Sequence, residues 1–178
     1  MPDFVRVGAE PHTWGSLVSQ WRAETESLGE HWDEEEQLQS DILRPLTERN
    51  DPKAGVYATV DDNGQYRSIC QLNTVGLPGY DKPVMRMRHL TFAPSIDLSG
   101  QAVDPYIEAL VETFWRVVRL CRTPGRMNAG FMNFHLPSPN DRTFFMVVGD
   151  SFVSNNLFGS IASKGSWLYI TMDTGGQE

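Results

Sequence analysis

Two histidines on segments predicted as strands are the residues of this chain best suited to acid–base chemistry. His89 falls within Val84–Phe92, and His135 falls within Ala129–Leu136. A histidine with a pKa of about 6.5 can take a proton from an amine near neutral pH. A histidine that is packed and hydrogen-bonded within a sheet is the structural alternative, and both interpretations stay open for each residue.

Two arginines lie close to His89 in the sequence, and strand alternation predicts that they face the other way. Arg86 and Arg88 could hold an acidic substrate, or they could form ion pairs on an exposed face. The alternation places Met85, Met87, His89 and Thr91 on one face of the strand and Arg86, Arg88, Leu90 and Phe92 on the other.

Other common catalytic chemistries lack their motifs. The two cysteines, Cys70 and Cys121, stand on apolar runs and are predicted to be buried small hydrophobes. They form no C-x-x-C pair and no Cys/His ligand spacing, so we expect no metal site. The chain also has no G-x-S-x-G elbow, no P-loop and no G-x-G-x-x-G after a strand.

Length and charge narrow the class of protein. With 178 residues, 40% of them hydrophobic, the chain fits a single domain over 1–178. The formal net charge of −8 argues against nucleic acid or an anionic membrane as a partner. The N-terminus has no basic segment followed by an apolar one, so we expect a cytoplasmic protein. An acidic cluster is predicted to be a solvated surface and comprises Glu24, Glu26, Glu30, Asp33, Glu34, Glu35 and Glu36.

Periodicity predicts the elements of the first half. Phe4–Val7 is a short strand, Thr13–Leu28 has apolar residues at helical spacing, and a D-x-x-E capping pattern at Asp33 starts a second helix that ends or kinks near Pro45. Val56–Val60 and Tyr66–Leu72 flank an Asn-Gly pair, which is typical of a β-hairpin with a type I′ turn.

The second half continues with Val84–Phe92 as a long strand and a loop over Ala93–Val103. Asp104 caps a long helix, and Ala129–Leu136 is a strand. Ser138 caps a shorter helix, and Ser151–Phe158 and Ser166–Met172 are predicted as the last two strands.

The predicted order is strand, helix, helix, hairpin, long strand, long helix, strand, short helix and two strands. From about Phe4 to Met172 this order resembles the GCN5-related N-acetyltransferase (GNAT) family. Leu90–Pro94 resembles the fourth strand of that family and its proline, and Phe144–Gly149 resembles its Y-x-x-x-G-F segment. The resemblance implies an α/β (α+β) fold, in which a mixed central sheet of about seven strands is flanked by helices.

The resemblance also implies a reaction and a donor. Members of the family move an acyl group from a coenzyme A thioester to an amine, so acetyl-CoA or another acyl-CoA is the implied cofactor. It favours His89 as the catalytic base, with His135 as the second catalytic candidate. The implied cofactor-binding residues are Leu90, Thr91, Phe92, Gly100, Gln101, Asn140 and Phe145.

Two features of the chain depart from the family pattern. The loop that should bind the pyrophosphate, Pro94–Asp104, has one glycine and no basic residue, and Asp97 adds negative charge. We therefore predict that acetyl-CoA binds weakly. Phe145 stands where the family often has a tyrosine that protonates the departing thiolate.

The leading hypothesis is a divergent GNAT-type acyltransferase that acts on a small-molecule amine of unknown identity. The first alternative is a non-catalytic GNAT-like domain that binds a small molecule or a protein. The second alternative is an enzyme related to acyl-homoserine-lactone synthases, because Leu72–Val75 faintly resembles the hairpin end of those enzymes. Whether the chain forms a homodimer stays open.

Overall fold

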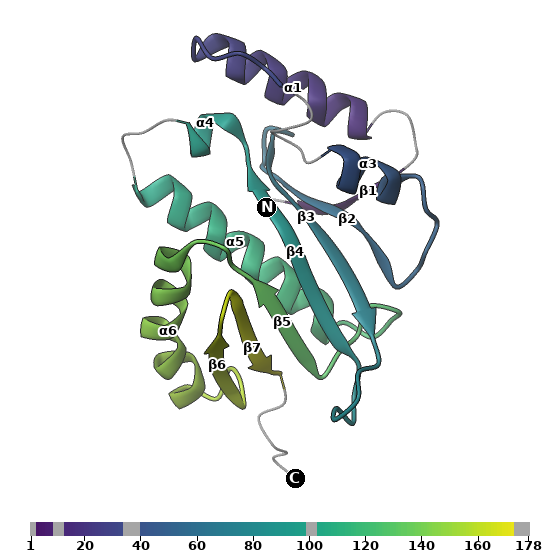
Figure 1. The fold of residues 1–178 in the computed structure, drawn as a ribbon, viewed down its shortest axis with the longest axis vertical. Helices are drawn as coiled ribbons and strands as arrows, with labels where there is room; N and C mark the ends of the chain where they lie inside the picture. Colours follow the sequence, from purple (N-terminus) through teal and green to yellow (C-terminus); the bar gives the residue numbers. More distant parts are fainter. Residues whose placement is uncertain (1–2, 9–12, 34–39, 99–102, 173–178) are drawn as a thin grey trace. The chain divides into compact units, whose positions relative to one another are not determined.

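A computed structural model describes residues 3–8, 13–33, 40–98 and 103–172 (Figure 1). Seven strands form one mixed sheet in the order β1-β2-β3-β4-β5-β7-β6, which confirms the predicted fold class. The strands are β1 Asp3–Val7, β2 Ala54–Val60, β3 Tyr66–Val75, β4 Val84–Phe92, β5 Phe131–His135, β6 Ser160–Lys164 and β7 Trp167–Thr171. The helices are α1 Thr13–Ser27, α3 Ser40–Thr47, α4 Pro94–Asp97, α5 Val103–Arg122 and α6 Pro139–Ser154.

The position of β4 is the main topological test of the sequence analysis. β4 is the middle strand and pairs with β5 in parallel, from Val84 opposite Phe131 to Met87 opposite Phe134. α5 connects the two strands, as a parallel pair requires. β7 lies between β5 and β6 and pairs with both in an antiparallel sense. The resemblance predicts that Val84–Phe92 lies centrally and runs parallel to Ala129–Leu136, and the position and the parallel pairing are both confirmed.

Two compact units divide the chain. The first contains Met1–Gln71 and His89–Val117, and the second contains Leu72–Arg88 and Val118–Glu178. β3 and β4 run through both units. The single domain expected over 1–178 stays a prediction.

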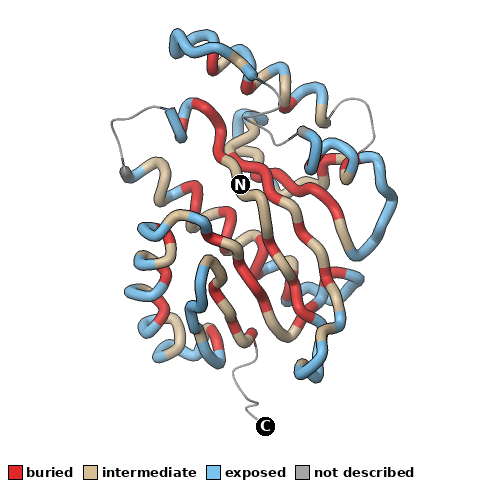
Figure 2. The backbone as a smooth tube through the Cα atoms, viewed as in Figure 1, coloured by how far each residue is buried: buried red, intermediate tan, exposed pale blue. Residues whose placement is uncertain are grey.

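In the first unit, α1 is held to the start of β3 by two side chains. The Trp21 indole Nε1 and the Gln20 amide both donate to the Tyr66 carbonyl oxygen, at 3.0 and 3.2 Å. The Tyr66 N–H donates in turn to Gln20 Oε1 at 2.8 Å. Leu17, Trp21 and Thr25 form the buried stripe of α1, whose other residues are exposed or half-buried (Figure 2).

A chain of buried hydroxyl groups joins β2, β3 and α5 in the same unit. Thr59 and Ser68 approach to 2.5 Å, Ser68 and Thr113 to 2.7 Å, and Thr113 donates to the Ala109 carbonyl oxygen at 2.8 Å. Because the Thr113 proton is used on that carbonyl, Ser68 must donate to Thr113 and Thr59 to Ser68.

In the second unit, the sheet has a buried apolar face. Its side chains are Met85, Met87, Met132, Phe134, Leu168 and Ile170, which are at most 2% exposed. Phe145 of α6 packs edge-on against Phe134, with ring centroids 5.5 Å apart. α6 packs on β6 at Gly149, where an added Cβ would make ordinary van der Waals contact with Ile161 at 3.4 Å.

The β2–β3 hairpin exists, but its turn is of another type than predicted. A type I′ turn needs positive φ at both Asn63 and Gly64, whereas the backbone has positive φ at Gly64 alone of this pair. The Asp61 carboxylate accepts the N–H groups of Asn63 and Gln65, both at 2.9 Å. These two bonds favour a three-residue loop in which Gly64 takes the left-handed position.

The predicted strand Ser151–Phe158 is wrong. α6 continues to Ser154, and the following strand, β6, begins at Ser160. The Ser154 hydroxyl donates to the Asp150 carbonyl oxygen and the Asn155 amide donates to that of Ser151. These bonds stabilise the last turn of the helix by occupying backbone carbonyls near its end. The apolar residues of that turn were predicted as the start of a strand.

The predicted helix boundaries were partly right. Ser138 caps α6 as predicted, accepting from the Asp141 N–H. α5 begins at Val103, so Asp104 lies inside its first turn, and the predicted loop Ala93–Val103 contains the short helix α4. Pro45 lies inside α3, which ends at Thr47. The capping pattern from Asp33 to Glu36 extends outside the described residues.

Candidate functional site

The backbone of β4 changes at His89. His89 has a φ of 51°, which an L-residue adopts at a cost of about 1–2 kcal/mol. The predicted alternation therefore holds as far as Arg88 and is interrupted at the histidine. Such outliers persist where the surrounding structure imposes them, and they gather at functional sites.

The three β4 residues predicted to contact the cofactor follow this break. Leu90 and Thr91 are half-buried, and Phe92 is buried with its ring centroid 4.8 Å from that of Tyr106 on α5. The Ala93 N–H donates to the Arg67 carbonyl oxygen of β3 at 2.9 Å, so the strand stays paired at its end. Their role in cofactor binding stays a prediction.

The segment predicted to bind the pyrophosphate begins with α4. Pro94 occupies its first turn, and the Ser95 N–H donates to the Glu24 carboxylate of α1 at 3.2 Å. A carboxylate of the chain itself thus occupies one donor of this helix end. The other predicted contacts of the loop, Gly100 and Gln101, lie outside the described residues.

The second predicted catalytic residue, His135, lies at the end of β5 in the second unit. Its ring centroid is 4.8 Å from that of Trp167 on β7, which is its partner in the register. The guanidinium carbons of Arg86 and Arg88 lie 5.6 and 5.3 Å from the centroid of the same indole. The structure therefore brings His135 together with both arginines through Trp167, while His89 belongs to the first unit.

The two α6 residues predicted to contact the cofactor differ in exposure. Asn140 is exposed in the first turn, and Phe145 is fully buried between Phe134 and Phe144. Because Phe145 is buried against two other phenylalanine rings, it has a packing role in the second unit. A cofactor role for either residue stays a prediction.

Sequence reasoning missed Trp167 and Glu24. Trp167 was placed on a strand, but its neighbours depend on the pairing of β7 with β5, which no local pattern predicts. Glu24 was grouped with the acidic surface residues, and its bond to Ser95 joins positions 71 residues apart. Both contacts depend on long-range geometry.

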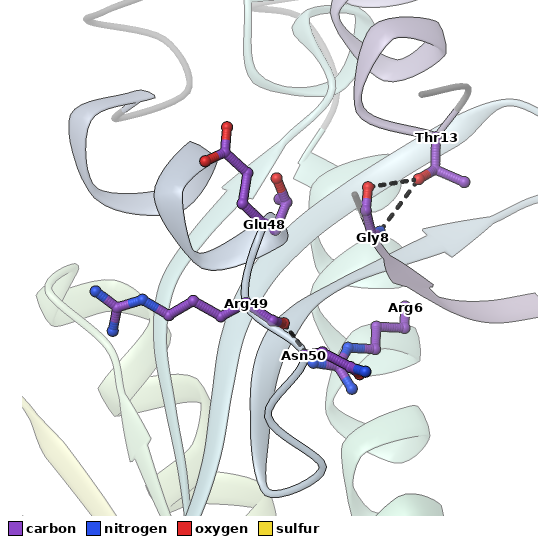
Figure 3. A pocket seen from close by; sticks show the side chains of 7 residues that line it. Arg6, Gly8, Thr13, Glu48, Arg49 and Asn50 are labelled. Carbon is purple, nitrogen blue, oxygen red and sulfur yellow. Dashed lines mark hydrogen bonds between the residues drawn. The ribbon is translucent and has the colours of Figure 1, made fainter. Parts of the chain in front are cut away.

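The first unit also has a polar pocket of about 470 Å³, lined in part by Arg6, Glu48 and Arg49 (Figure 3). Arg6 Nη2 donates to the carbonyl oxygens of Arg49, Asp51 and Ala54, at 3.1, 2.8 and 2.9 Å. The guanidinium thus holds β1 against the segment before β2. Its role in this pocket is structural.

The cysteines are buried, as predicted. Burial raises the pKa of the Cys70 thiol, and it raises the pKa of Cys121 to about 12. Thiols in this state are poor nucleophiles. Among the described residues, no group of three or more His, Cys, Asp or Glu side chains could hold a metal ion. The described helices include none that is long and apolar enough to cross a membrane.

No family model matches the chain, and no curated protein matches it. Solved structures of acetyltransferases are similar to the chain in structure. A probable acetyltransferase of Staphylococcus epidermidis has a TM-score of 0.49 and 10% identity, over 96% of this chain and 96% of its own. The structure described as histone acetyltransferase HPA2 and related acetyltransferase, from Corynebacterium glutamicum, has a TM-score of 0.49 and 10% identity, over 99% and 98%.

A third similar structure is a GNAT family acetyltransferase from Brucella melitensis in complex with acetyl-CoA. It has a TM-score of 0.41 and 13% identity, over 100% of this chain and 91% of its own. Identities of 10–13% do not show that this chain shares the chemistry of these proteins, because the chemistry depends on its own residues.

Proposed function

We propose that this chain moves an acyl group from an acyl-CoA thioester to an amine. The observation that carries the proposal is the backbone of β4. Its parallel ladder with β5 covers Val84–Met87, and the strand then breaks regular geometry at His89 and continues to Phe92. Where a strand continues past its paired neighbour, its backbone N–H and C=O groups can form hydrogen bonds with an extended ligand. The pantetheine arm of coenzyme A is such a ligand. The sheet order and the parallel β4–β5 pair support the same function.

In the proposed reaction, the amine nitrogen attacks the thioester carbonyl carbon. A C–N bond forms, the C–S bond breaks, and the departing thiolate takes a proton from water. The amine must lose a proton, and His89 is the proposed base, with His135 as the second candidate. Both imidazoles are half-buried, so they combine access with partial shielding from water.

Phe145 sets the expected rate. The side chain is 0% exposed and has no proton to donate, so it cannot protonate the sulfur. A thiol has a pKa of about 8.5, so the thiolate is a tolerable leaving group without help. General acid catalysis typically contributes about a hundred- to ten-thousandfold. Turnover should therefore be slow compared with an enzyme that has the tyrosine.

A non-catalytic binding domain is the second candidate function. The observation that favours it is the Glu24 carboxylate on the Ser95 N–H, at the start of the segment that would face a pyrophosphate. Asp97 adds a second negative charge in the same helix. These charges oppose a coenzyme A nucleotide, but they leave the arm-binding part of β4 unaffected.

Calorimetry with coenzyme A fragments tests the donor site. We expect acetyl-CoA to bind saturably but on the order of a hundredfold more weakly than a low-micromolar ligand, because two or three charge-assisted bonds of about 1.5–3 kcal/mol are missing. Acetyl-pantetheine should retain most of that affinity, whereas adenosine 3′,5′-bisphosphate should show little. Absence of binding for acetyl-CoA and for longer acyl-CoAs would sink the donor site and favour the binding domain.

A further inference from the structure

One face of the sheet in the second unit carries cations and aromatic rings. The register places Arg86 beside Asn133 and Asn133 beside Tyr169, and it places His135 beside Trp167. Together with Arg88, these six residues form what is called here the Arg–Trp face. The opposite face holds the buried methionines and Phe134 described above. The Arg–Trp face is half-buried, except for Asn133, which is 7% exposed.

Trp167 is the common neighbour of three of these side chains. Both guanidinium groups lie over its ring, and the His135 ring lies against it at 51°. Arg88 Nε is buried and has no hydrogen-bond partner in the described part of the chain. A guanidinium keeps its charge and its donors at any physiological pH. A buried donor without an acceptor costs free energy, and no acceptor of the described residues offsets that cost at Arg88 Nε.

The charge of this face favours a negatively charged ligand. The face positions of β4, β5, β6 and β7 hold no aspartate or glutamate, and Lys164 of β6 adds a third cation. The whole chain has a net charge of −8, so a local excess of cations is unusual for it. A carboxylate matches the planar fork of a guanidinium with two parallel hydrogen bonds.

We propose that the Arg–Trp face binds the carboxylate of the acceptor, so that the acceptor amine is an amino acid or a similar small amine with a carboxylate. The inference rests on the proposed acyl transfer and deepens it. Arg86 and Arg88 hold the carboxylate, and Trp167 packs against the rest of the molecule. His135 touches the same indole, so a carboxylate held by the arginines keeps the acceptor within reach of an imidazole.

Binding without any acyl donor gives the first readout. Three pairs serve as probes: phenylalanine with 2-phenylethylamine, alanine with ethylamine, and lysine with cadaverine. In ligand-observed NMR titrations, each amino acid should bind at least tenfold more tightly than its decarboxylated partner. Arg88→Gln should abolish that preference, and Arg88→Lys should restore a part of it, because lysine keeps the charge but loses the fork. Arg126→Gln removes an exposed cation of the same unit and should change nothing.

Acyl transfer to the same pairs gives the second readout. The preference for the amino acid should lie in KM, and Arg86→Gln and Arg88→Gln should raise KM for the amino acids at least tenfold more than KM for the decarboxylated amines. Thermal unfolding reports whether each variant folds, and Trp167→Phe, which keeps a ring under the guanidiniums, provides a milder variant of the same face. That variant should retain part of the preference.

Failure of this inference and failure of the proposed function give different experimental results. If decarboxylated amines are acylated as well as amino acids, the carboxylate subsite is overturned and acyl transfer stands. If no amine is acylated but amino acids bind through Arg88, the subsite stands and acyl transfer is overturned. If an acidic peptide binds to this face more tightly than every amino acid, the small-molecule assignment is overturned.

Discussion

Glu24 of α1 accepts a hydrogen bond from the backbone N–H of Ser95 in α4, at 3.2 Å. The same carboxylate accepts from the Gln20 amide at 2.6 Å, so it is fixed by two donors. A carboxylate at a helix start stabilises that helix, and it also repels any anion that approaches the same N–H groups. In the proposed enzyme, Glu24 therefore lowers the affinity for the nucleotide part of an acyl-CoA.

Glu24→Gln tests this repulsion. Glutamine keeps an oxygen that can accept from Ser95, so the contact survives while the charge is removed. Loss of one charge near the pyrophosphate should strengthen acetyl-CoA binding by on the order of 1 kcal/mol, which is about fivefold in Kd. Calorimetry at low and high salt provides the measurement, and the gain should shrink at high salt.

Glu26→Gln is the matched control, since Glu26 is exposed on the same helix. It should change the affinity less than Glu24→Gln. Equal effects of the two substitutions would mean that Glu24 acts through net charge alone.

His89 should be a position where glycine is more stable than alanine. Both substitutions remove the imidazole, so the difference between them reports the backbone. In a regular strand glycine is less stable by about 0.5–1 kcal/mol, but at a φ of 51° the alanine Cβ is strained. We expect His89→Gly to exceed His89→Ala by about 1 kcal/mol in free energy of unfolding, measured in urea. The opposite order would show that His89 has ordinary strand geometry in solution.

The hydroxyl chain predicts an unequal response to two small substitutions. Ser68→Ala removes the acceptor of the Thr59 proton, which leaves a buried donor unpaired at a cost of about 1–3 kcal/mol. Thr59→Val removes a hydroxyl while Ser68 still donates to Thr113, so its cost should be smaller. Urea unfolding of the two variants provides the comparison. A larger loss for Thr59→Val would reverse the donor direction inferred here.

The buried thiols predict a loss of stability in alkaline solution. The pKa of Cys121 is about 12 in the folded chain, and that of Cys70 is also raised by burial, both from an ordinary value of 9.0. Above pH 9 the unfolded chain releases these protons while the folded chain keeps them. Stability is therefore fully present below pH 9 and falls as the pH rises, by about 1.4 kcal/mol per pH unit for each thiol.

Urea unfolding at pH 8 and pH 10 measures that slope. A variant with Cys70→Ala and Cys121→Ala should lose much less stability between the two pH values than the wild type, even if it is less stable at both. Equal losses would assign the alkaline effect to other groups, such as Tyr57 and Tyr66, whose pKa values burial also raises.

Periodicity predicted most elements of this fold because burial on one face leaves a regular pattern. α1, the β2–β3 hairpin, β4 and α5 were found in this way, and the resemblance supplied the pairing of β4 with β5. The failures have local causes that hydrophobicity does not reveal. The last turn of α6 is as apolar as a strand, and the hairpin turn is decided by two bonds to the Asp61 carboxylate.

The candidate site was predictable as residue types but not as an arrangement. His89 and His135 stand on the expected strands, yet the positive φ of His89 has no sequence signal beyond the tolerance of histidine for that region. The gathering of Arg86, Arg88 and His135 around Trp167 depends on the register between β4, β5 and β7. Periodicity gives the face of a residue, and pairing gives its neighbours.

Mass spectrometry of the acylated product tests the central claim most directly. The purified chain is incubated with acetyl-CoA or octanoyl-CoA at millimolar concentration and with the amino acids named above. The account predicts slow accumulation of an N-acyl amino acid together with an equal amount of free coenzyme A, and it predicts that His89→Ala lowers the rate while Arg126→Gln does not. Absence of any N-acylated product with every donor and acceptor, from a chain that binds acyl-CoA, would contradict the claim that this protein is an acyltransferase.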